Sequence, residues 1–235
     1  KKILTTAILC AGLVGFTACD SFLDEEPKSS LTLDTYYKTS ADIIGNVNYL
    51  YRDGAPDKMG NMTGAYRGSS LSVMNMVTGY FVNEYEGQEV DCSYARQLTR
   101  QNFTQSCCNY LTNDTWKGCY KSINVANAVI KYVDGVEMDG QAQYKAEARF
   151  FRALNYFYLV KMFGDVPMIT EPTEDATLVE YPARTAASEV YKTVIIPDLQ
   201  FAVENLPDAT FAGNSHRVTK YAADMLLADV YMRLG

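Results

Sequence analysis

Apolar residues recur every three or four positions along much of this chain, which is the spacing of one face of an α-helix. Capping residues and helix breakers divide the pattern into segments, with Ser, Thr, Asn or Asp at the start of most segments and Gly or Pro at the end. The segments predicted to be helices span residues 40–52, 113–135, 141–163, 188–207 and 219–235. Residues 71–82 are a further helical candidate.

The start of each helix is predicted from a capping residue. The run from Thr39 to Asp42 offers N-cap chemistry ahead of the first helix. Either Asn113 or Asp114 can cap the second helix, and Ser188 opens the fourth. The last helix is expected to begin after Thr219, and Pro197 must kink or break the fourth helix in the turn ahead of it.

The helix of residues 141–163 is expected to lie at the centre of the fold. Its second half has apolar residues on nearly all sides, so that it needs neighbours all round. Gly164 ends it, and the run from Asp165 to Pro167 turns the chain. This helix also shares a spacing of two alanines and a tyrosine with the last helix: Ala148, Ala153 and Tyr156, and Ala223, Ala228 and Tyr231. Small residues at helix crossings are typical of tetratricopeptide-like helix pairs, so we predict an all-α fold.

The N-terminal segment has the pattern of an export signal. Lys1 and Lys2 precede an uncharged, mostly apolar run that ends in small residues just before Cys19, which predicts a secretory signal peptide over residues 1–18. The run from Thr17 to Cys19 resembles a bacterial lipobox, which implies that Cys19 is the lipid attachment site. The alternative is an ordinary cleavage site with an incidental cysteine. Residues 19–30 are acidic and predict a tether.

Composition excludes one class of partner. The formal charge is −7, and removing Lys1 and Lys2 with the signal lowers it to −9. An acidic surface with no Lys/Arg-rich run repels phosphate backbones, so nucleic-acid binding is not expected. The chain holds 18 Tyr, a residue that suits sugar or peptide surfaces and helix packing equally.

The sequence does not decide whether the cysteines form disulfides. After Cys19 the chain contains Cys92, Cys107, Cys108 and Cys119, which allow three pairings. A bridge from Cys92 or Cys119 to the Cys107–Cys108 pair is one hypothesis, and buried free thiols are the other. Zinc is a poor alternative because no C-x-x-C pair exists and the chain has a single histidine. We therefore expect neither a metal nor a cofactor.

A glycine-bounded stretch, residues 79–87, is the candidate ligand-binding loop. It places aromatic rings, an amide and acids between two glycines, and loops carry binding residues more often than the elements they connect. Aromatic faces stack on sugar rings, while amides and acids bind hydroxyls. The alternative for each residue is ordinary loop packing. The candidates, chosen by composition and place, are Tyr80, Phe81, Asn83, Tyr85 and Tyr94.

Four stretches together resemble the SusD/RagB family of nutrient-binding outer-membrane lipoproteins. They are CDSFLDEEP (residues 19–27), YKAEARFFRALNYF (144–157), GDVPMI (164–169) and VTKYAADMLLADVY (218–231). The resemblance implies an α-helical fold of tetratricopeptide-like pairs with long irregular loops. Family members are roughly twice this length, so we expect residues 31–235 to be the N-terminal part of such a domain, with its C-terminal part absent.

The resemblance also implies a function. It is the capture of an oligosaccharide or other nutrient at the cell surface and its transfer to a SusC-like TonB-dependent transporter, on which the lipid-anchored protein sits as a hinged lid. Arg149 and Arg152 match the family's Glu-Ala-Arg-x-x-Arg-Ala pattern, and we expect a structural role in which one of them pairs with Asp165.

Two alternatives to nutrient binding are considered. An enzyme is not favoured, because His216 stands alone and no G-x-S-x-G or H-E-x-x-H motif occurs. A glycoside hydrolase needs only two carboxylates about 5–9 Å apart, which the sequence does not test. The other alternative is a structural or adhesive helical-repeat lipoprotein.

Overall fold

A computed structural model describes residues 33–52, 78–80, 96–97, 99–102, 104–174 and 182–235. The α-helices are α2 (Leu33–Tyr36), α3 (Ser40–Arg52), α6 (Gln105–Tyr132), α7 (Gln141–Phe163), α8 (Ala187–Val190), α9 (Ile196–Asn205) and α10 (Lys220–Leu234). Shorter elements are the 3-10 turns η2 (Val133–Gly135) and η5 (Ala212–Asn214), the π-helical turn η4 (Tyr191–Ile195), and the strands β1 (Val166–Pro167) and β2 (Arg184–Thr185). The all-α prediction is confirmed. In these described ranges we find no helix long and apolar enough to cross a bilayer.

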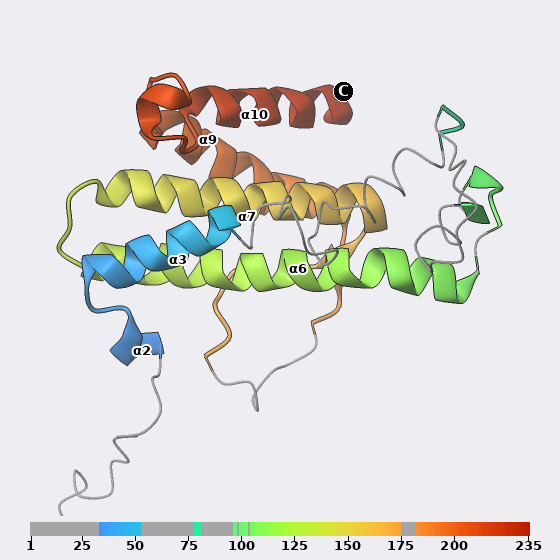
Figure 1. Cartoon of the computed structure of the whole chain (residues 1–235), viewed down its shortest axis with the longest axis horizontal. Helices are drawn as coiled ribbons and strands as arrows, with labels where there is room; N and C mark the ends of the chain where they lie inside the picture. Colours follow the sequence, from blue (N-terminus) through green and yellow to red (C-terminus); the bar gives the residue numbers. More distant parts are fainter. Residues whose placement is uncertain (1–32, 53–77, 81–95, 98, 103, 175–181) are drawn as a thin grey trace, which may run out of the picture. The chain divides into compact units, whose positions relative to one another are not determined.

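The helices pack as successive antiparallel pairs. Figure 1 shows α6 and α7 side by side in opposite directions, followed by α9 and α10 in the same relation. α7 contacts α6 on one side and α9 on the other, while α3 lies against both α6 and α7. The predicted central place of the helix over 141–163 is confirmed, since twelve of its residues are buried. Among them is Tyr156, which is fully enclosed.

The first predicted helix and its cap agree with the structure. α3 begins at Ser40, and Thr39 and Asp42 form a reciprocal cap. The Thr39 backbone amide donates to Oδ2 of Asp42 at 2.8 Å, and the Asp42 amide donates to Oγ1 of Thr39 at 3.4 Å. The hydrogen bond from the Thr39 hydroxyl is the main cause of a lowered Asp42 pKa. The cap therefore stabilises the charged carboxylate.

The predicted start of the second helix is wrong. α6 begins at Gln105 and passes through Asn113 and Asp114 without a break. No glycine or proline stands between Gln105 and Asn113, so nothing stops the helix from extending toward its N-terminus. A capping residue permits a helix to begin but does not force it to.

Pro197 has the predicted effect on the fourth helix. Its ring nitrogen cannot donate to the carbonyl four residues earlier. In the structure the turn ahead of it, Tyr191–Ile195, widens to a π-helix, and α9 follows with Pro197 in its first turn. The predicted cap at Ser188 is wrong, because α8 begins at Ala187 after Ala186, which makes no side-chain cap. The carboxylate of Asp165 caps this helix from outside, accepting from the Ala187 amide at 2.9 Å.

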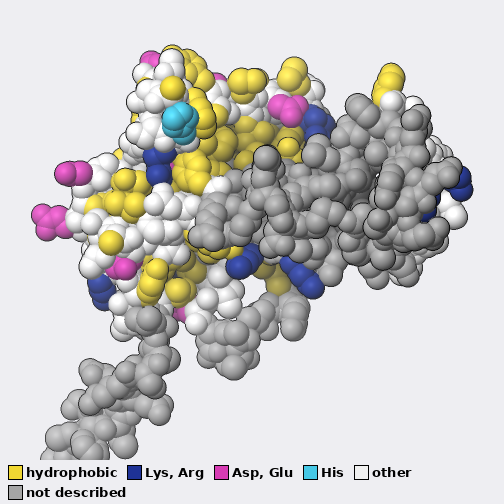
Figure 2. Space-filling view, in the orientation of Figure 1, with side chains coloured by type: hydrophobic (Ala, Val, Ile, Leu, Met, Phe, Trp, Pro, Cys, Tyr) yellow, Lys and Arg dark blue, Asp and Glu magenta, His cyan; other side chains and the backbone are white. Residues whose placement is uncertain are grey.

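The predicted repeat between α7 and α10 holds in part. Ala148, Ala153 and Tyr156 are all buried in α7, whereas in α10 Ala223 is buried and Ala228 and Tyr231 are exposed. The reason is that α7 lies between α6 and α9, while α10 contacts mainly α9. Hydrophobic side chains therefore reach the surface over α10 in Figure 2. They include Tyr221, Met225 at 76% exposure and Met232 at 77%.

Candidate functional site

The structure describes the first two residues of the candidate ligand loop, Gly79 and Tyr80, and thus one of the five candidate binding residues. Thr78, Gly79 and Tyr80 form a turn in which the Tyr80 amide donates to Oγ1 of Thr78 at 3.3 Å and Gly79 has φ +78°. Tyr80 is 89% exposed, so its ring is available to a ligand. The other predicted binding residues and the predicted lipid site lie outside the described residues: Phe81, Asn83, Tyr85, Tyr94 and Cys19.

The loop after α7 is held by hydroxyl and amide groups from the helix core. The Tyr156 hydroxyl accepts from the Ile169 amide at 2.7 Å and donates to the Ile169 carbonyl at 2.9 Å. Tyr120 donates to the Pro167 carbonyl at 2.7 Å. Asn127 donates to the carbonyls of Ile169 and Glu171 at 3.0 and 3.2 Å. Burial raises the pKa of Tyr156 to about 12, which keeps its hydroxyl protonated and able to donate.

Arg152 pairs with Asp198 on α9 and not, as expected, with Asp165. It also binds Asn127, the residue that holds the loop after α7. Its Nε and Nη2 donate to the Asp198 carboxylate at 2.7 and 2.9 Å, and its Nη1 donates to Asn127 at 2.9 Å. Asp165 lies beyond the end of α7, and the helix from Arg152 to its last residue, Phe163, already spans about 16 Å. α9 instead runs beside the middle of α7, so Asp198 is the acid within reach.

The second arginine of the motif joins the same carboxylate. Nη1 of Arg149 lies 3.7 Å from Oδ1 of Asp198, and its guanidinium lies over the Phe201 ring at 4.3 Å from the centroid. Burial raises the pKa of Asp198, and the hydrogen bonds and charges of the two arginines act in the opposite direction. The predicted structural role of the arginine pair is thus confirmed with a different partner.

A second buried carboxylate, Glu147, ties three segments together. It accepts from Arg217 at 2.6 Å, from the Tyr51 hydroxyl at 2.9 Å and from Gln143 at 3.1 Å. Tyr51 also accepts from the Val218 amide at 2.9 Å. Burial disfavours the charged guanidinium, but the hydrogen bond and charge of Glu147 outweigh it and raise the Arg217 pKa. α3, α7 and the segment before α10 are therefore fixed to one another.

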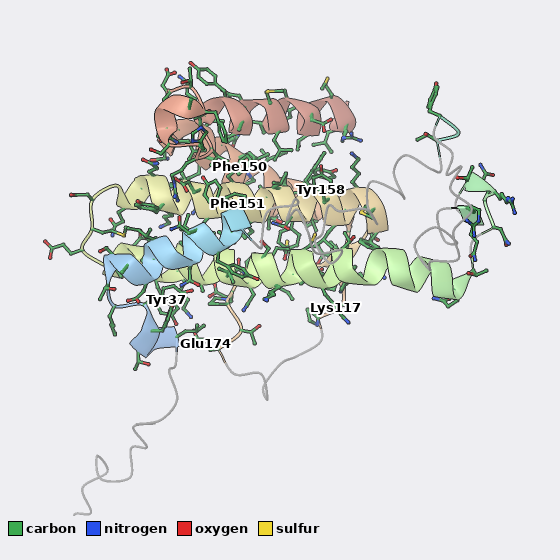
Figure 3. All side chains as sticks on the ribbon, viewed as in Figure 1. Tyr37, Lys117, Phe150, Phe151, Tyr158 and Glu174 are labelled. Atoms are coloured by element: carbon green, nitrogen blue, oxygen red, sulfur yellow. The ribbon has the colours of Figure 1, made fainter. Side chains whose placement is uncertain are left out.

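A cluster at the end of α6 holds the start of the described chain. Tyr37, just after α2, stacks on Tyr132 at the end of α6, with centroids 5.2 Å apart. The Tyr132 hydroxyl donates to Glu174 at 2.9 Å, and Lys131 bridges to the same carboxylate at 2.5 Å. Figure 3 labels Tyr37 and Glu174 on the same side of α6. α2 and the loop after α7 are thereby joined through the end of α6.

Cys119 contradicts the disulfide hypothesis as far as it concerned that residue. Its thiol is free and fully buried in α6. Burial raises its pKa to about 12, because the apolar surroundings disfavour the thiolate. Cys92 lies outside the described residues, and the side chains of Cys107 and Cys108 are likewise outside the described part.

The described residues offer a scaffold and no assembled catalytic group. His216 is exposed in a loop with φ +61° and packs edge-on against Phe211, with centroids 5.3 Å apart. The two fully enclosed carboxylates, Glu147 and Asp198, are both held by arginines. Within the described ranges no three His, Cys, Asp or Glu side chains form a group able to hold a metal ion.

Sequence reasoning missed Asp198 and Glu147 as organising residues. Both stand among apolar residues on predicted helices, and an acid at an inward-facing position is the signal that could have identified them. Their partners, in contrast, lie 46 and 70 positions away and depend on the packing.

The fold and site define a class: an array of antiparallel helix pairs that carries a loop with an exposed aromatic residue. The chain belongs to the SusD-like family, described as "starch-binding associating with outer membrane", whose model matches residues 21–232.

Curated and structural relatives agree with this assignment. SusD-like protein P2 of Formosa agariphila is 30% identical over 237 residues, covering 100% of this chain and 43% of the relative. A SusD superfamily protein of Parabacteroides distasonis has a similar structure, with 28% identity, a TM-score of 0.63, and coverage of 80% of this chain and 38% of that one. A laminarin-binding SusD-like protein has 26% identity, a TM-score of 0.65, and coverage of 83% and 40%. The chain thus spans about two fifths of these relatives' length.

Proposed function

We propose that the protein captures a glycan at the cell surface and delivers it to a SusC-like TonB-dependent outer-membrane transporter, without breaking a bond. The observation that carries the proposal is the family match over residues 21–232, together with a relative of similar fold that binds laminarin. The exposed ring of Tyr80 supports it.

In the proposed mechanism the helical array is a rigid support for variable loops. The Arg152–Asp198 and Glu147–Arg217 pairs cross-link successive helices, so that loops leaving them start from fixed points. A sugar ring would stack on Tyr80, with neighbouring loop residues Phe81, Asn83, Tyr85 and Tyr94 completing the site. Preorganisation reduces the entropy lost on binding, which matters because each sugar contact is weak.

Glycan binding is tested with the full-length protein on a glycan array, followed by calorimetry on the best ligand and on laminarin. Aromatic stacking is worth about 0.5–1.5 kcal/mol, so Tyr80→Ala should weaken binding roughly 2- to 12-fold. The matched control is Phe211→Ala, which removes an exposed ring from another loop and should leave the affinity unchanged. Failure of the wild-type protein to bind any glycan would refute the function. An unaffected Tyr80 variant would refute only the assigned site.

The anchor and the transporter are separate parts of the proposal. Lipidation at Cys19 predicts that the native protein partitions with outer membranes and that Cys19→Ser releases it. Solubilised membranes should yield the protein together with a large β-barrel transporter. Recovery with membranes but without such a partner would favour the structural or adhesive alternative, and sugar released from a bound glycan would favour a hydrolase.

A further inference from the structure

One hollow on the described surface plays no part in the proposed glycan site. It lies where the N-terminus of α3 meets the turn between η2 and α7, and its volume is about 570 Å³. The residues that line it come from α3, from that turn and from the first turn of α7: Ser40, Ile44, Glu137, Met138, Asp139 and Tyr144. Its size suits a small molecule or the end of a larger one.

The aromatic wall of this hollow is held in place from behind. The Arg217 guanidinium lies over the Tyr144 ring at 5.3 Å from the centroid, and Arg217 is itself bound to Glu147. Gly140 has φ +70°, and a Cβ placed there would lie 3.6 Å from Cε2 of Tyr144, so the backbone approaches the ring edge closely. The wall is therefore ordered before a ligand arrives, which lowers the entropic cost of binding.

The polar lining consists mainly of hydrogen-bond acceptors. Ionised Glu137 and Asp139 accept and cannot donate, while the hydroxyls of Ser40 and Tyr144 can do either. Within the described ranges Glu137 and Asp139 make no ion pair, whereas nearby Asp134 is paired with Lys145. A neutral sugar can donate hydroxyl hydrogen bonds to these carboxylates, but it leaves their negative charges without a counter-charge. A cation brings donors alone and complements this lining.

The remaining walls suit the stem of such a cation. Ile44 and Met138 provide apolar surface, and the Tyr144 ring attracts a positive charge through its π-face. An alkyl chain can lie along these walls while its charged end reaches the two carboxylates, as lysine and arginine stems do on protein surfaces. We propose that this hollow binds a small organic cation, a primary ammonium or guanidinium group on a short apolar stem.

Methyl NMR tests the proposal, because two lining residues carry reporter methyl groups. The full chain is labelled at Met and Ile methyls and titrated with n-butylammonium, and in parallel with 1-butanol as a neutral ligand of the same shape. We expect saturable shifts of Met138 and Ile44 with a Kd of roughly 1–10 mM for the ammonium, and no saturable shift for the alcohol. The exposed Met225 and Met232 on α10 report non-specific effects and should not move.

Variants separate the site from general attraction to an acidic protein. The isosteric double variant Glu137→Gln/Asp139→Asn should weaken binding at least tenfold, while Glu204→Gln, an exposed acid on α9, should have no effect. Equal shifts with butanol, or unchanged shifts in the double variant, would overturn the proposal. Comparison of glucosamine with Nα-acetyl-lysine amide then shows whether an amino sugar or a lysine side chain is the better carrier of the cation. None of these readouts depends on glycan binding.

Discussion

Replacement of Asp198 with asparagine is the sharpest test of how this helical array is held together. The substitution keeps the size of the side chain and removes its charge. Asp198 and Arg152 have 2% and 10% of their side chains exposed, and Arg149 adds a second guanidinium at 3.7 Å. The variant therefore leaves the enclosed Arg152 without its counter-charge. The NH2 group of the new asparagine also faces N–H groups of the guanidinium, so that two donors meet.

The expected loss follows from that burial. Removing one partner of a buried ion pair costs about 3–5 kcal/mol, because the remaining charge is not resolvated. A domain of ordinary stability has a free energy of unfolding of about 5–15 kcal/mol, so the substitution removes a large part of that stability. With a urea dependence of about 2 kcal/mol/M, the unfolding midpoint should fall by roughly 1.5–2.5 M.

Urea unfolding followed by far-UV circular dichroism measures this loss, with two further variants alongside. Glu204→Gln, an exposed acid on the same helix, is the matched control and should change stability by less than about 0.5 kcal/mol. The double variant Arg152→Met/Asp198→Leu removes both charges of the pair. Its remaining cost comes from the unpartnered Asn127 oxygen, about 1–3 kcal/mol, and from Arg149, which loses the same carboxylate but is 26% exposed and so stays partly solvated. It should therefore be more stable than Asp198→Asn alone.

Two outcomes would contradict this reasoning. If Asp198→Asn fell within about 1 kcal/mol of the Glu204 control, the buried pair would not hold the helices together. If the double variant were as unstable as the single one, the loss would come from shape and not from uncompensated charge.

Three further predictions follow from local geometry. Gly164→Ala should destabilise the protein by about 1–3 kcal/mol, because φ +68° with ψ −124° suits glycine alone. Gly45→Ala lies in mid-helix with free space around it and should stabilise the protein by about 0.5–1 kcal/mol. Thermal unfolding of the two variants measures both effects. Cys119 should resist iodoacetamide in the native protein and react once urea unfolds it, as mass spectrometry can show; rapid native alkylation would contradict its burial. Since the folded pKa of Asp42 is lowered, its contribution to stability is present above the ordinary carboxyl pKa and lost as pH falls through the lowered value. Carboxyl NMR should give a midpoint below 3.8, and Asp42→Asn should remove the acid-induced loss of amide protection at Thr39.

Helix identity and order were predictable because they depend on short-range signals. The apolar spacing of residues 40–52 and 141–163 and the glycine at 164 lie within a few turns of the helices they define, and the structure agrees with them to the residue. The start of α6 was not predictable in the same way. Asn113 and Asp114 are good caps, but a helix with no breaker before them can extend past them.

The ligand-binding role of the candidate loop stays a prediction. Tyr80 is exposed as a ligand-binding ring should be, and that much follows from a glycine-bounded aromatic stretch. How the loops are supported does not follow from any local pattern, because Asn127, Tyr156 and Asp198 come together from three different segments.

By itself the sequence determined most of the helical segments and the family to which the chain belongs, because periodicity, caps and motifs are properties of neighbouring residues. It did not predict α2 or the part of α6 before Asn113, and the helical candidate over 71–82 lies mostly outside the described residues, with a turn at 78–80. Tertiary structure alone decided that Arg152 pairs with Asp198, that Cys119 is an enclosed free thiol, and that Ala228 is exposed while Ala153 is buried. The physical reason is that charge pairing and burial depend on which helix lies alongside, and that choice is made by packing over the whole chain.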